Sequence, residues 1–437
     1  MNEAIATIAS LAFGGNGVCR INGKVCFVPF SCPGDELRLA VTTEKRSYQL
    51  ARIVEVLVPS PFRVTAPCPV FGSCGGCAWQ HIDYAQQLLA KQQILTDALW
   101  RGARVDGSCV RPVIPSPSQY GYRSRVQLKL HAAAGRLRIG FFRNNSHTVE
   151  DAGEGCPIAL PAINQALSAL RRVLAAFPEI AAIAEISINC AEQGVVAVIS
   201  YSGCDSTVTT AFFLERRADL APLTGLFLRT GRTAALRKVY GDELLTYTLP
   251  AAAAEAPAIR LSYQPAGFSQ VNQDQNRAML EVVRRLAGFQ ATESVLDLYC
   301  GNGNFSLPIA GEVAGVLGIE ENAGSITAAT ANMTANGISN AEFIRADALA
   351  GVKQLADGGR SFDTVIIDPP RAGAAELVGE LYRLNPARII YVSCDPSTLA
   401  RDCGLLGGSG YQVRECVPLD MFPQTYHLES VTLLQKQ

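Results

Sequence analysis

Apolar and polar positions follow three different patterns along the chain. Residues 4–58 carry short apolar runs separated by turn signals at 14–17, 22–23 and 33–35. Asn22-Gly23 between two apolar runs is a strong hairpin signal. Short strands at this spacing are typical of a small barrel. We therefore expect a five-stranded, OB-like β-barrel at the N-terminal end.

The second stretch mixes elements, and the third is regular. A cysteine cluster follows the barrel, a helix is expected over 84–101, and mixed strands and helices continue to about residue 249. The Ala-rich segment 250–258 predicts a linker. Beyond it, buried strands alternate with helical runs, which predicts a parallel sheet with crossover helices. The pattern predicts a multidomain α/β protein with domains at 1–58, 59–258 and 259–437.

Composition places the chain among ordinary globular proteins. It has 437 residues, of which 48% are hydrophobic and 18% charged. No signal peptide and no apolar run of ~18 residues is found, so we expect a cytoplasmic protein that does not enter a membrane. Its 14 cysteines are unusual there, because thiols in a reducing compartment more often serve as ligands or nucleophiles than as disulfides.

Charge gives a local signal only. The net charge is -1, but residues 111–149 contain basic residues interleaved with aromatic ones and no acidic residue. This mixture suits phosphate neutralisation and base stacking, and it suits a solvated strand pair equally well. The basic residues are Arg111, Arg123, Arg125, Lys129, Arg136, Arg138 and Arg143.

The ends of three predicted strands form a candidate cofactor site. The strand 294–299 runs into a glycine-containing turn at 300–304, where the backbone can approach a ligand at a helix N-terminus. The next strand ends in Glu320, where a ribose-binding acid is expected, and a third ends in Asp347, placed to accept an adenine amino group. A nicotinamide dinucleotide would require a third glycine at Ser306, beside its pyrophosphate. S-adenosylmethionine has no phosphate, so the pattern favours it over a dinucleotide or a ligand-free core.

Two further strands end in motifs that carry chemistry. One ends in Asp368-Pro-Pro-Arg371 and the other in Ser393-Cys-Asp-Pro396, and His427-Leu-Glu-Ser430 lies near the C-terminus. With Phe268-Ser-Gln-Val-Asn272, these segments resemble the RNA uracil-5 methyltransferases, in the same order across the whole catalytic domain. The resemblance is closest to the enzymes that methylate 23S rRNA.

The resemblance implies a covalent mechanism. Carbon 5 of uracil is too weakly nucleophilic to attack a sulfonium methyl group until a thiolate adds to carbon 6, and a base must then remove the proton at carbon 5. By resemblance, Cys394 is the nucleophile and Glu429 the base, and the uridine is flipped out of its stack. The implied S-adenosyl-L-methionine site consists of Gln270, Tyr299, Asn304, Glu320, Asp347 and Asp368.

Two related chemistries fit less well. Cytosine-5 RNA methyltransferases normally carry a further cysteine in the Asp-Pro loop, and this chain has none there. An amino-directed adenine methyltransferase would favour an aromatic residue after the prolines, where the chain has Arg371. It would also need neither a nucleophile nor a terminal acid.

Four other cysteines form a candidate metal site. Cys68, Cys74 and Cys77 lie in a glycine-containing loop, and Cys156 follows much later. Four thiolates can hold zinc or an iron–sulfur cluster, and spacing does not distinguish the two. Many uracil-5 methyltransferases of ribosomal RNA carry this arrangement with a [4Fe–4S] cluster, so the resemblance implies that cofactor in a structural role.

The resemblance also sets the expected architecture and substrate. The N-terminal barrel resembles a TRAM domain, the central α+β domain would carry the iron–sulfur cluster, and the C-terminal domain would be a Rossmann-like class I methyltransferase. We expect a monomer that methylates a uridine of 23S rRNA. The same chemistry on tRNA is the alternative. A non-catalytic RNA-binding assembly factor is a further alternative, which the presence of Cys394 and Glu429 disfavours. A small-molecule methyltransferase is another, which the N-terminal barrel disfavours.

Overall fold

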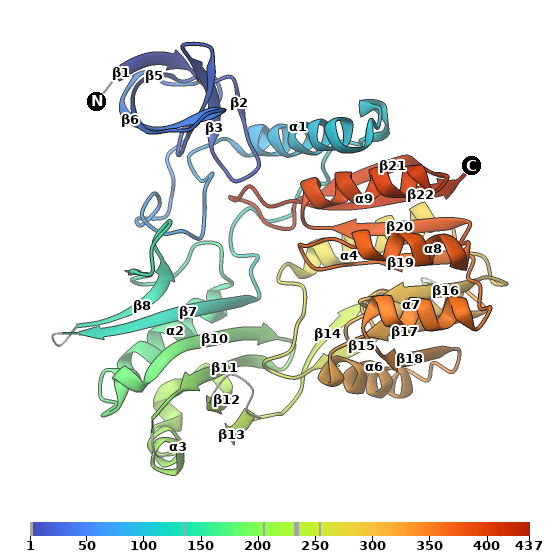
Figure 1. The fold of residues 1–437 in the computed structure, drawn as a ribbon. Helices are drawn as coiled ribbons and strands as arrows, with labels where there is room; N and C mark the ends of the chain where they lie inside the picture. Colours follow the sequence, from blue (N-terminus) through green and yellow to red (C-terminus); the bar gives the residue numbers. More distant parts are fainter. Residues whose placement is uncertain (1–2, 134–135, 204–205, 231–235, 253–254) are drawn as a thin grey trace.

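The computed structural model contains three parts that follow one another along most of the chain (Figure 1). An N-terminal barrel lies above a mixed sheet, and both flank a larger α/β part. Among the described residues, no helix is long and apolar enough to cross a membrane. The structure describes residues 3–133, 136–203, 206–230, 236–252 and 255–437.

The N-terminal part is a β-barrel, as predicted, with one strand more than expected. The extra strand is the two-residue β2, which pairs with β3. The predicted hairpin at Asn22-Gly23 joins β3 to β4, and both residues have positive φ, as a two-residue hairpin turn requires. The strand order is β1-β5-β6-β4-β3-β2. The strands are β1 (Glu3–Thr7), β2 (Ser10–Leu11), β3 (Gly17–Ile21), β4 (Lys24–Val28), β5 (Glu36–Glu44) and β6 (Tyr48–Val58).

A seven-stranded mixed sheet forms most of the middle part. Its order is β13-β12-β11-β10-β7-β8-β9, and α2 (Pro161–Leu174) and α3 (Ser206–Glu215) cover its apolar side. The loop that carries Cys68, Cys74 and Cys77 precedes this sheet and lies against β8 through a hydrogen bond from Gly75 N–H to Phe142 O (2.9 Å). The strands are β7 (Arg125–Ala133), β8 (Arg136–Phe142), β9 (Val149–Asp151), β10 (Ile183–Ala191), β11 (Gly194–Tyr201), β12 (Leu223–Thr230) and β13 (Leu236–Tyr240).

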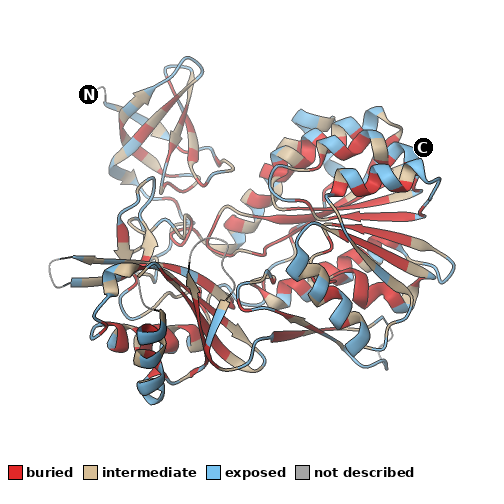
Figure 2. Cartoon of the chain, turned by 60° about the horizontal axis from the view of Figure 1, so that its bottom comes forward, coloured by how far each residue is buried: buried red, intermediate tan, exposed pale blue. Residues whose placement is uncertain are grey.

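The C-terminal part is a seven-stranded sheet with helices on both faces. The order is β18-β17-β16-β19-β20-β22-β21, parallel except for β22, which is antiparallel to both neighbours. Figure 2 shows these strands, apart from the edge strand β18, buried along most of their length, as expected between two helical layers. The strands are β16 (Ser294–Leu298), β17 (Gly315–Glu320), β18 (Ala341–Arg345), β19 (Thr364–Ile367), β20 (Arg388–Ser393), β21 (Tyr411–Leu419) and β22 (Glu429–Lys436).

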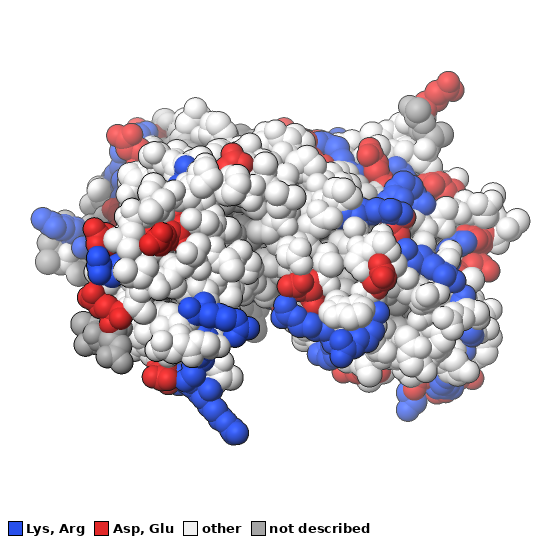
Figure 3. Space-filling view, turned by 90° about the horizontal axis from the view of Figure 1, so that it is seen from above, with Lys and Arg blue, Asp and Glu red and all other residues white. Residues whose placement is uncertain are grey.

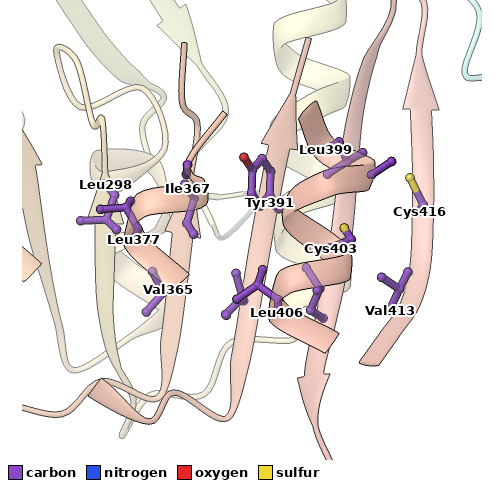
Figure 4. Close-up of a cluster of buried hydrophobic side chains, with 14 of the residues drawn as sticks. Leu298, Val365, Ile367, Leu377, Tyr391, Leu399, Cys403, Leu406, Val413 and Cys416 are labelled. Carbon is purple, nitrogen blue, oxygen red and sulfur yellow. The ribbon is translucent and has the colours of Figure 1, made fainter. Parts of the chain in front are cut away.

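The connecting helices of this sheet follow the predicted parallel pattern. On one face, Leu399, Cys403 and Leu406 of α9 pack on Ile367 and Tyr391 (Figure 4). The helices are α4 (Gln273–Ala287), α5 (Ser306–Ile309), α6 (Ala323–Ala335), α7 (Ala348–Asp357), α8 (Val378–Leu384) and α9 (Pro396–Gly408).

Helix α1 (Tyr84–Ala103) lies within the predicted central domain but packs on the C-terminal sheet. Its buried Leu95 and Leu99 share one hydrophobic cluster with Leu399 and Cys403 of α9. Gly102 approaches Ala400 so closely that a Cβ would lie 2.7 Å from the Ala400 side chain. The helix therefore extends the helical layer of the C-terminal part, beside α9.

The predicted linker 250–258 is the connection of a hairpin. Strands β14 (Leu245–Leu249) and β15 (Ile259–Tyr263) pair antiparallel on either side of it, and residues 253–254 lie outside the described residues. Tyr247 and Leu261 are buried in the core of the C-terminal part. The predicted domain boundary at 258/259 thus falls between two paired strands.

Candidate active site

A cavity of about 740 Å³ opens at the carboxyl ends of β16, β17, β19 and β20. Ligands of doubly wound sheets bind at this edge, since loops from neighbouring strands converge there. The cavity collects seven of the eight residues expected for cofactor binding and catalysis. They are Gln270, Tyr299, Glu320, Asp347, Asp368, Cys394 and Glu429.

The loop after β16 brings backbone close to one end of the cavity. Tyr299 has a φ of 63°, unusual for a bulky side chain, and Gly301 and Gly303 also have positive φ. Glu320 holds the loop, because its carboxylate accepts the N–H of Gly301 at 3.2 Å and of Asn322 at 2.7 Å. The strained turn is thereby fixed in a shape that exposes polar groups to a ligand.

Asp347 lies at the same end of the cavity. Its carboxylate caps α7 by accepting the Ala350 N–H at 3.0 Å, while the residue itself remains exposed. The cap fixes the carboxylate at the end of the third strand, where the sequence analysis expected an adenine-binding acid.

Asn304 is not among the residues that line the cavity. Its side-chain amide exchanges two hydrogen bonds with Asn276 (2.9 and 3.0 Å) and accepts one from the Tyr247 hydroxyl at 3.0 Å. Burial raises the pKa of that hydroxyl, so it stays protonated and donates. Asn304 therefore lies behind the Gly301–Gly303 turn and supports it.

The other end of the cavity gathers Cys394, Asp368 and Glu429. Burial, followed by the charge of Glu429, raises the pKa of Cys394 to about 11, while Arg371 partly opposes the shift. Burial raises the pKa of Asp368 to about 7, with a smaller contribution from Asp297. Glu429 is buried, and its pKa lies well above the usual range, chiefly through lost solvation. Cys394 is therefore a thiol in the free protein at neutral pH.

Three residues outside the expected set of eight line this end as well. Arg371 places a positive charge beside Cys394 and Glu429 and lowers the pKa of both. His427 is largely neutral, because burial and the charge of Arg371 lower its pKa to about 4. Phe422 belongs to the connection between β21 and β22. The sequence signal for Phe422 as a cavity residue is weak, because it consists of an aromatic side chain in an irregular segment.

The loop that carries Asp368 and Arg371 is anchored from below. Buried Asp402 of α9 accepts the Ala374 N–H at 2.7 Å and the Tyr391 hydroxyl at 2.6 Å. The neighbouring Arg401 donates to Ala372 O at 2.7 Å. These contacts fix the Asp-Pro-Pro-Arg loop relative to β20, the strand that ends beside Cys394.

The four remaining candidate cysteines surround a second, much smaller cavity of about 50 Å³. Cys68, Cys74, Cys77 and Cys156 all line it, although Cys156 is distant in sequence. Burial raises the pKa of Cys77 to about 12 and that of Cys74 to about 11, and the neighbouring thiols add to both shifts. Among the described residues, no three Cys, His, Asp or Glu side chains are close enough to hold one metal ion.

Comparison with known proteins bears directly on this geometry. The profile of the family described as tRNA (Uracil-5-)-methyltransferase matches residues 83–437, and that of a tRNA (uracil(54)-C(5))-methyltransferase TRAM domain matches residues 5–62. The chain belongs to the uracil-5 methyltransferase family. The first match includes α1 with the C-terminal sheet, in agreement with their packing.

Two curated relatives and one solved structure match nearly the whole chain of this methyltransferase. "23S rRNA (uracil(1939)-C(5))-methyltransferase RlmD" of Pectobacterium atrosepticum is 32% identical, covering 98% of this chain and 92% of the relative. The protein of that name from Aromatoleum aromaticum is 35% identical, with 99% of each chain covered. A Pyrococcus abyssi tRNA (uracil-54, C5)-methyltransferase in complex with S-adenosyl-L-homocysteine superposes with a TM-score of 0.74 at 25% identity, covering 99% and 100% of the two chains.

Membership in the family confirms the predicted activity class. The protein is an S-adenosylmethionine-dependent RNA methyltransferase that acts on carbon 5 of uracil, with the predicted TRAM domain at its N-terminus. A covalent adduct between cysteine and uracil is general for the family, which agrees with a cavity that combines one thiol with carboxylates.

Proposed function

We propose that this methyltransferase modifies 23S rRNA at the uridine equivalent to position 1939. The supporting observation is that two relatives with this specificity in their names match at least 98% of the chain at 32% and 35% identity. Charge on the surface agrees with an RNA substrate. Basic side chains gather on both sides of the notch between two lobes (Figure 3), as phosphate contacts require.

Cys394 is the proposed nucleophile. Its thiolate forms the Sγ–C6 bond, and the electrons of the C5=C6 bond move to O4 to give an enolate. Because the pKa of Cys394 is raised to about 11 in the free protein, the thiol must pass its proton to solvent when the uracil binds. The electron pair then returns through carbon 5 to the sulfonium methyl group, and the S–CH₃ bond breaks with its electrons on sulfur.

Glu429 is the proposed base for the second half of the reaction. It removes the proton from carbon 5, so that the C5=C6 bond re-forms and Cys394 leaves as a thiolate. The raised pKa of Glu429 makes its carboxylate a stronger proton acceptor than an exposed one. Arg371 balances the negative charge that appears near Cys394 and Asp368 as the adduct forms.

The methyl donor is proposed to bind at the opposite end of the same cavity. Glu320 would accept hydrogen bonds from the ribose, Asp347 from the adenine amino group, and Gln270, Tyr299 and Asp368 would contact the remainder. Asn304 would act on the cofactor through the turn that it supports.

The four-cysteine cavity is proposed to hold a [4Fe–4S] cluster. The donor set fits, because four cysteines from two distant segments surround one enclosed space, and four thiolates on a cube lie further apart than four on a single ion. When bound, the cluster would brace the loop 68–77 against Cys156, and methyl transfer itself needs no electron.

Transfer RNA is the second candidate substrate, favoured by the Pyrococcus abyssi likeness. Mapping of 5-methyluridine by mass spectrometry in a strain lacking the gene distinguishes the two. We expect the nucleoside to disappear from one position of 23S rRNA and to persist in tRNA. Loss from tRNA alone would contradict the rRNA proposal. If purified protein bound 23S rRNA but transferred no label from S-adenosylmethionine, the non-catalytic reading would hold instead.

A further inference from the structure

Segment 420–428, which joins β21 to β22, is held mainly by residues from outside the C-terminal sheet. It carries Phe422 and His427 to the cavity wall and ends at Glu429, the first residue of β22. The bonds to its main chain are Asp420 N–H to Ile114 O (3.0 Å), Asn272 Nδ2 to Met421 O (3.3 Å), Lys91 Nζ to Phe422 O (3.1 Å), Tyr122 Oη to Pro423 O (3.0 Å), Ala78 and Trp79 N–H to Gln424 O (3.1 and 3.0 Å), and Gln424 N–H to Gln87 Oε1 (3.0 Å).

Helix α1 supplies the charged contact with this segment. Lys91 Nζ lies 2.5 Å from Asp420 Oδ1, and both side chains are completely buried. Replacing a buried ion pair by apolar residues is often neutral or stabilising, so such a pair is weak evidence of a stabilising role. What this pair does is fix the position of Asp420 relative to α1. The ammonium group also donates to Phe422 O, which fixes the segment at two points.

Gln87 lies one turn before Lys91 on the same face of α1 and holds the segment at its most strained residue. Gln424 has a φ of 70°, a conformation that a non-glycine residue keeps only when its surroundings impose it. Gln87 accepts the Gln424 N–H and donates to its Oε1, each at 3.0 Å. The two hydrogen bonds hold both the main chain and the side chain of Gln424.

The barrel touches the same segment on its outer side. Phe13 packs edge-on against Tyr426, with ring centroids 5.5 Å apart, and Tyr426 lies 4.2 Å from the ring of His427. The barrel is itself tied to the base of α1 by a hydrogen bond from Trp79 Nε1 to Gly15 O (3.0 Å). The barrel and α1 thus both contact segment 420–428, which carries residues of the cavity wall.

We propose that Lys91 and Gln87 are positioning residues for methyl transfer. Neither lines the cavity; together they fix segment 420–428 so that His427 and Glu429 face Cys394. The inference rests on the roles proposed for Cys394 and Glu429. Because a displacement of about 1 Å can cost about 100-fold in rate, loosening this segment should slow the reaction while leaving the methyl donor bound.

The test compares four variants in single-turnover methylation of an unmodified 23S rRNA transcript. Lys91→Met with Asp420→Asn removes the ion pair without leaving a buried charge, and Gln87→Leu removes the clamp on Gln424. Gln93→Leu is the matched control on the exposed side of α1. Arg388→Met is a stability control, because it removes an ion pair with Glu293 at the opposite edge of the sheet.

We expect the rate at saturating substrates to fall about 10- to 100-fold in the first two variants and less than about twofold in the controls. Binding of labelled S-adenosylmethionine should stay within about twofold of wild type in all four. A Lys91→Arg variant that keeps Asp420 retains a positive charge at this position. It should therefore be faster than the variant that lacks the ion pair. Unchanged rates in the folded first two variants, or a loss confined to KM for RNA, would overturn the proposal.

Cys394→Ala and Glu429→Gln, assayed on the same transcript, separate two kinds of failure. If they are as active as wild type, the assigned chemistry is wrong, whatever the α1 variants do. If they are impaired while the Lys91 and Gln87 variants are not, only the positioning role fails.

Discussion

Cys394 and the group of four cysteines at 68, 74, 77 and 156 lie in surroundings that differ sharply. Cys394 stands alone in a cavity of about 740 Å³ beside carboxylates and an arginine. The four cysteines at 68, 74, 77 and 156 face one another across about 50 Å³, lined largely by apolar side chains. The first cavity is by far the larger of the two.

The two sites also differ in the groups that act most strongly on the pKa of their thiols. Arg371 and Glu429 act on the pKa of Cys394 in opposite directions, so its ionisation can respond to whatever binds next to it. The pKa of Cys77 is raised by burial and by the neighbouring thiols, so Cys77 is a neutral thiol at neutral pH in the free protein. A lone thiol among charged groups suits bond making, whereas a ring of thiols suits permanent ligation.

The largest expected effect follows from removing the lone thiol, Cys394, from the larger cavity. Cys394→Ala should lower the methylation rate by at least about 1,000-fold, because no other thiol lines the cavity among the described residues. Equilibrium dialysis should find S-adenosylmethionine bound as in wild type, and iron content should be unchanged. Substantial turnover by this variant would contradict covalent catalysis through Cys394.

The second prediction concerns the partner of that thiol. Glu429→Gln should lower the rate about 100-fold and let the protein–RNA adduct accumulate, since the proton at carbon 5 then has no acceptor. Denaturing gels with labelled 23S rRNA transcript measure the adduct. Cys394→Ala should form none under the same conditions, and an absence of adduct in both variants would remove Glu429 from the role of base.

The third prediction addresses the four-cysteine site. Cys77→Ser should lose most of the bound iron after anaerobic purification and reduce the free energy of unfolding by about 2–4 kcal/mol. Cys109→Ser is the matched control, because Cys109 is half-buried and lines neither cavity. Zinc in place of iron in the wild-type protein would contradict the proposed cluster while leaving the ligand set intact.

The smallest expected effect concerns the ionisation of Cys394, which depends on the charged groups around it. Because the pKa of Cys394 is raised to about 11, its thiolate fraction in the RNA-free protein should grow about tenfold per pH unit between pH 7 and 9. Alkylation by iodoacetamide, followed on the Cys394 peptide by mass spectrometry, should rise in proportion. Arg371→Met should slow alkylation several-fold, since the pKa then rises further. A flat pH profile would argue against a buried thiol.

Much of the active site was predictable because its residues sit at strand ends. A buried strand can be identified from its apolar run, and parallel strands bring their carboxyl ends to one edge. Tyr299, Glu320, Asp368 and Cys394 follow from this rule, and all four line the cavity. Asn304 lies further on, in the turn before α5, where the direction of a side chain does not follow from the strand, and it bonds Asn276 instead.

Other features depended on contacts between distant segments. The period of α1 identifies a helix with an apolar face, but not the surface that this face will meet. Strand β14 could not be assigned to the C-terminal part, because its partner β15 follows an Ala-rich segment that has the composition of a linker. Phe422 lies in an irregular segment that is held by distant residues, among them residues of α1, which is more than 300 residues earlier in the chain.

The packing of α1 on α9 has a consequence for how the protein is made. The helix leaves the ribosome early, yet the surface that covers Leu95 and Leu99 is synthesised near the end of the chain. For most of translation the part of the apolar face of α1 that packs on α9 has no native partner, a situation that slows folding and invites aggregation. We expect the nascent chain to need a chaperone during this interval and to become protease-resistant around α1 only when α9 has emerged.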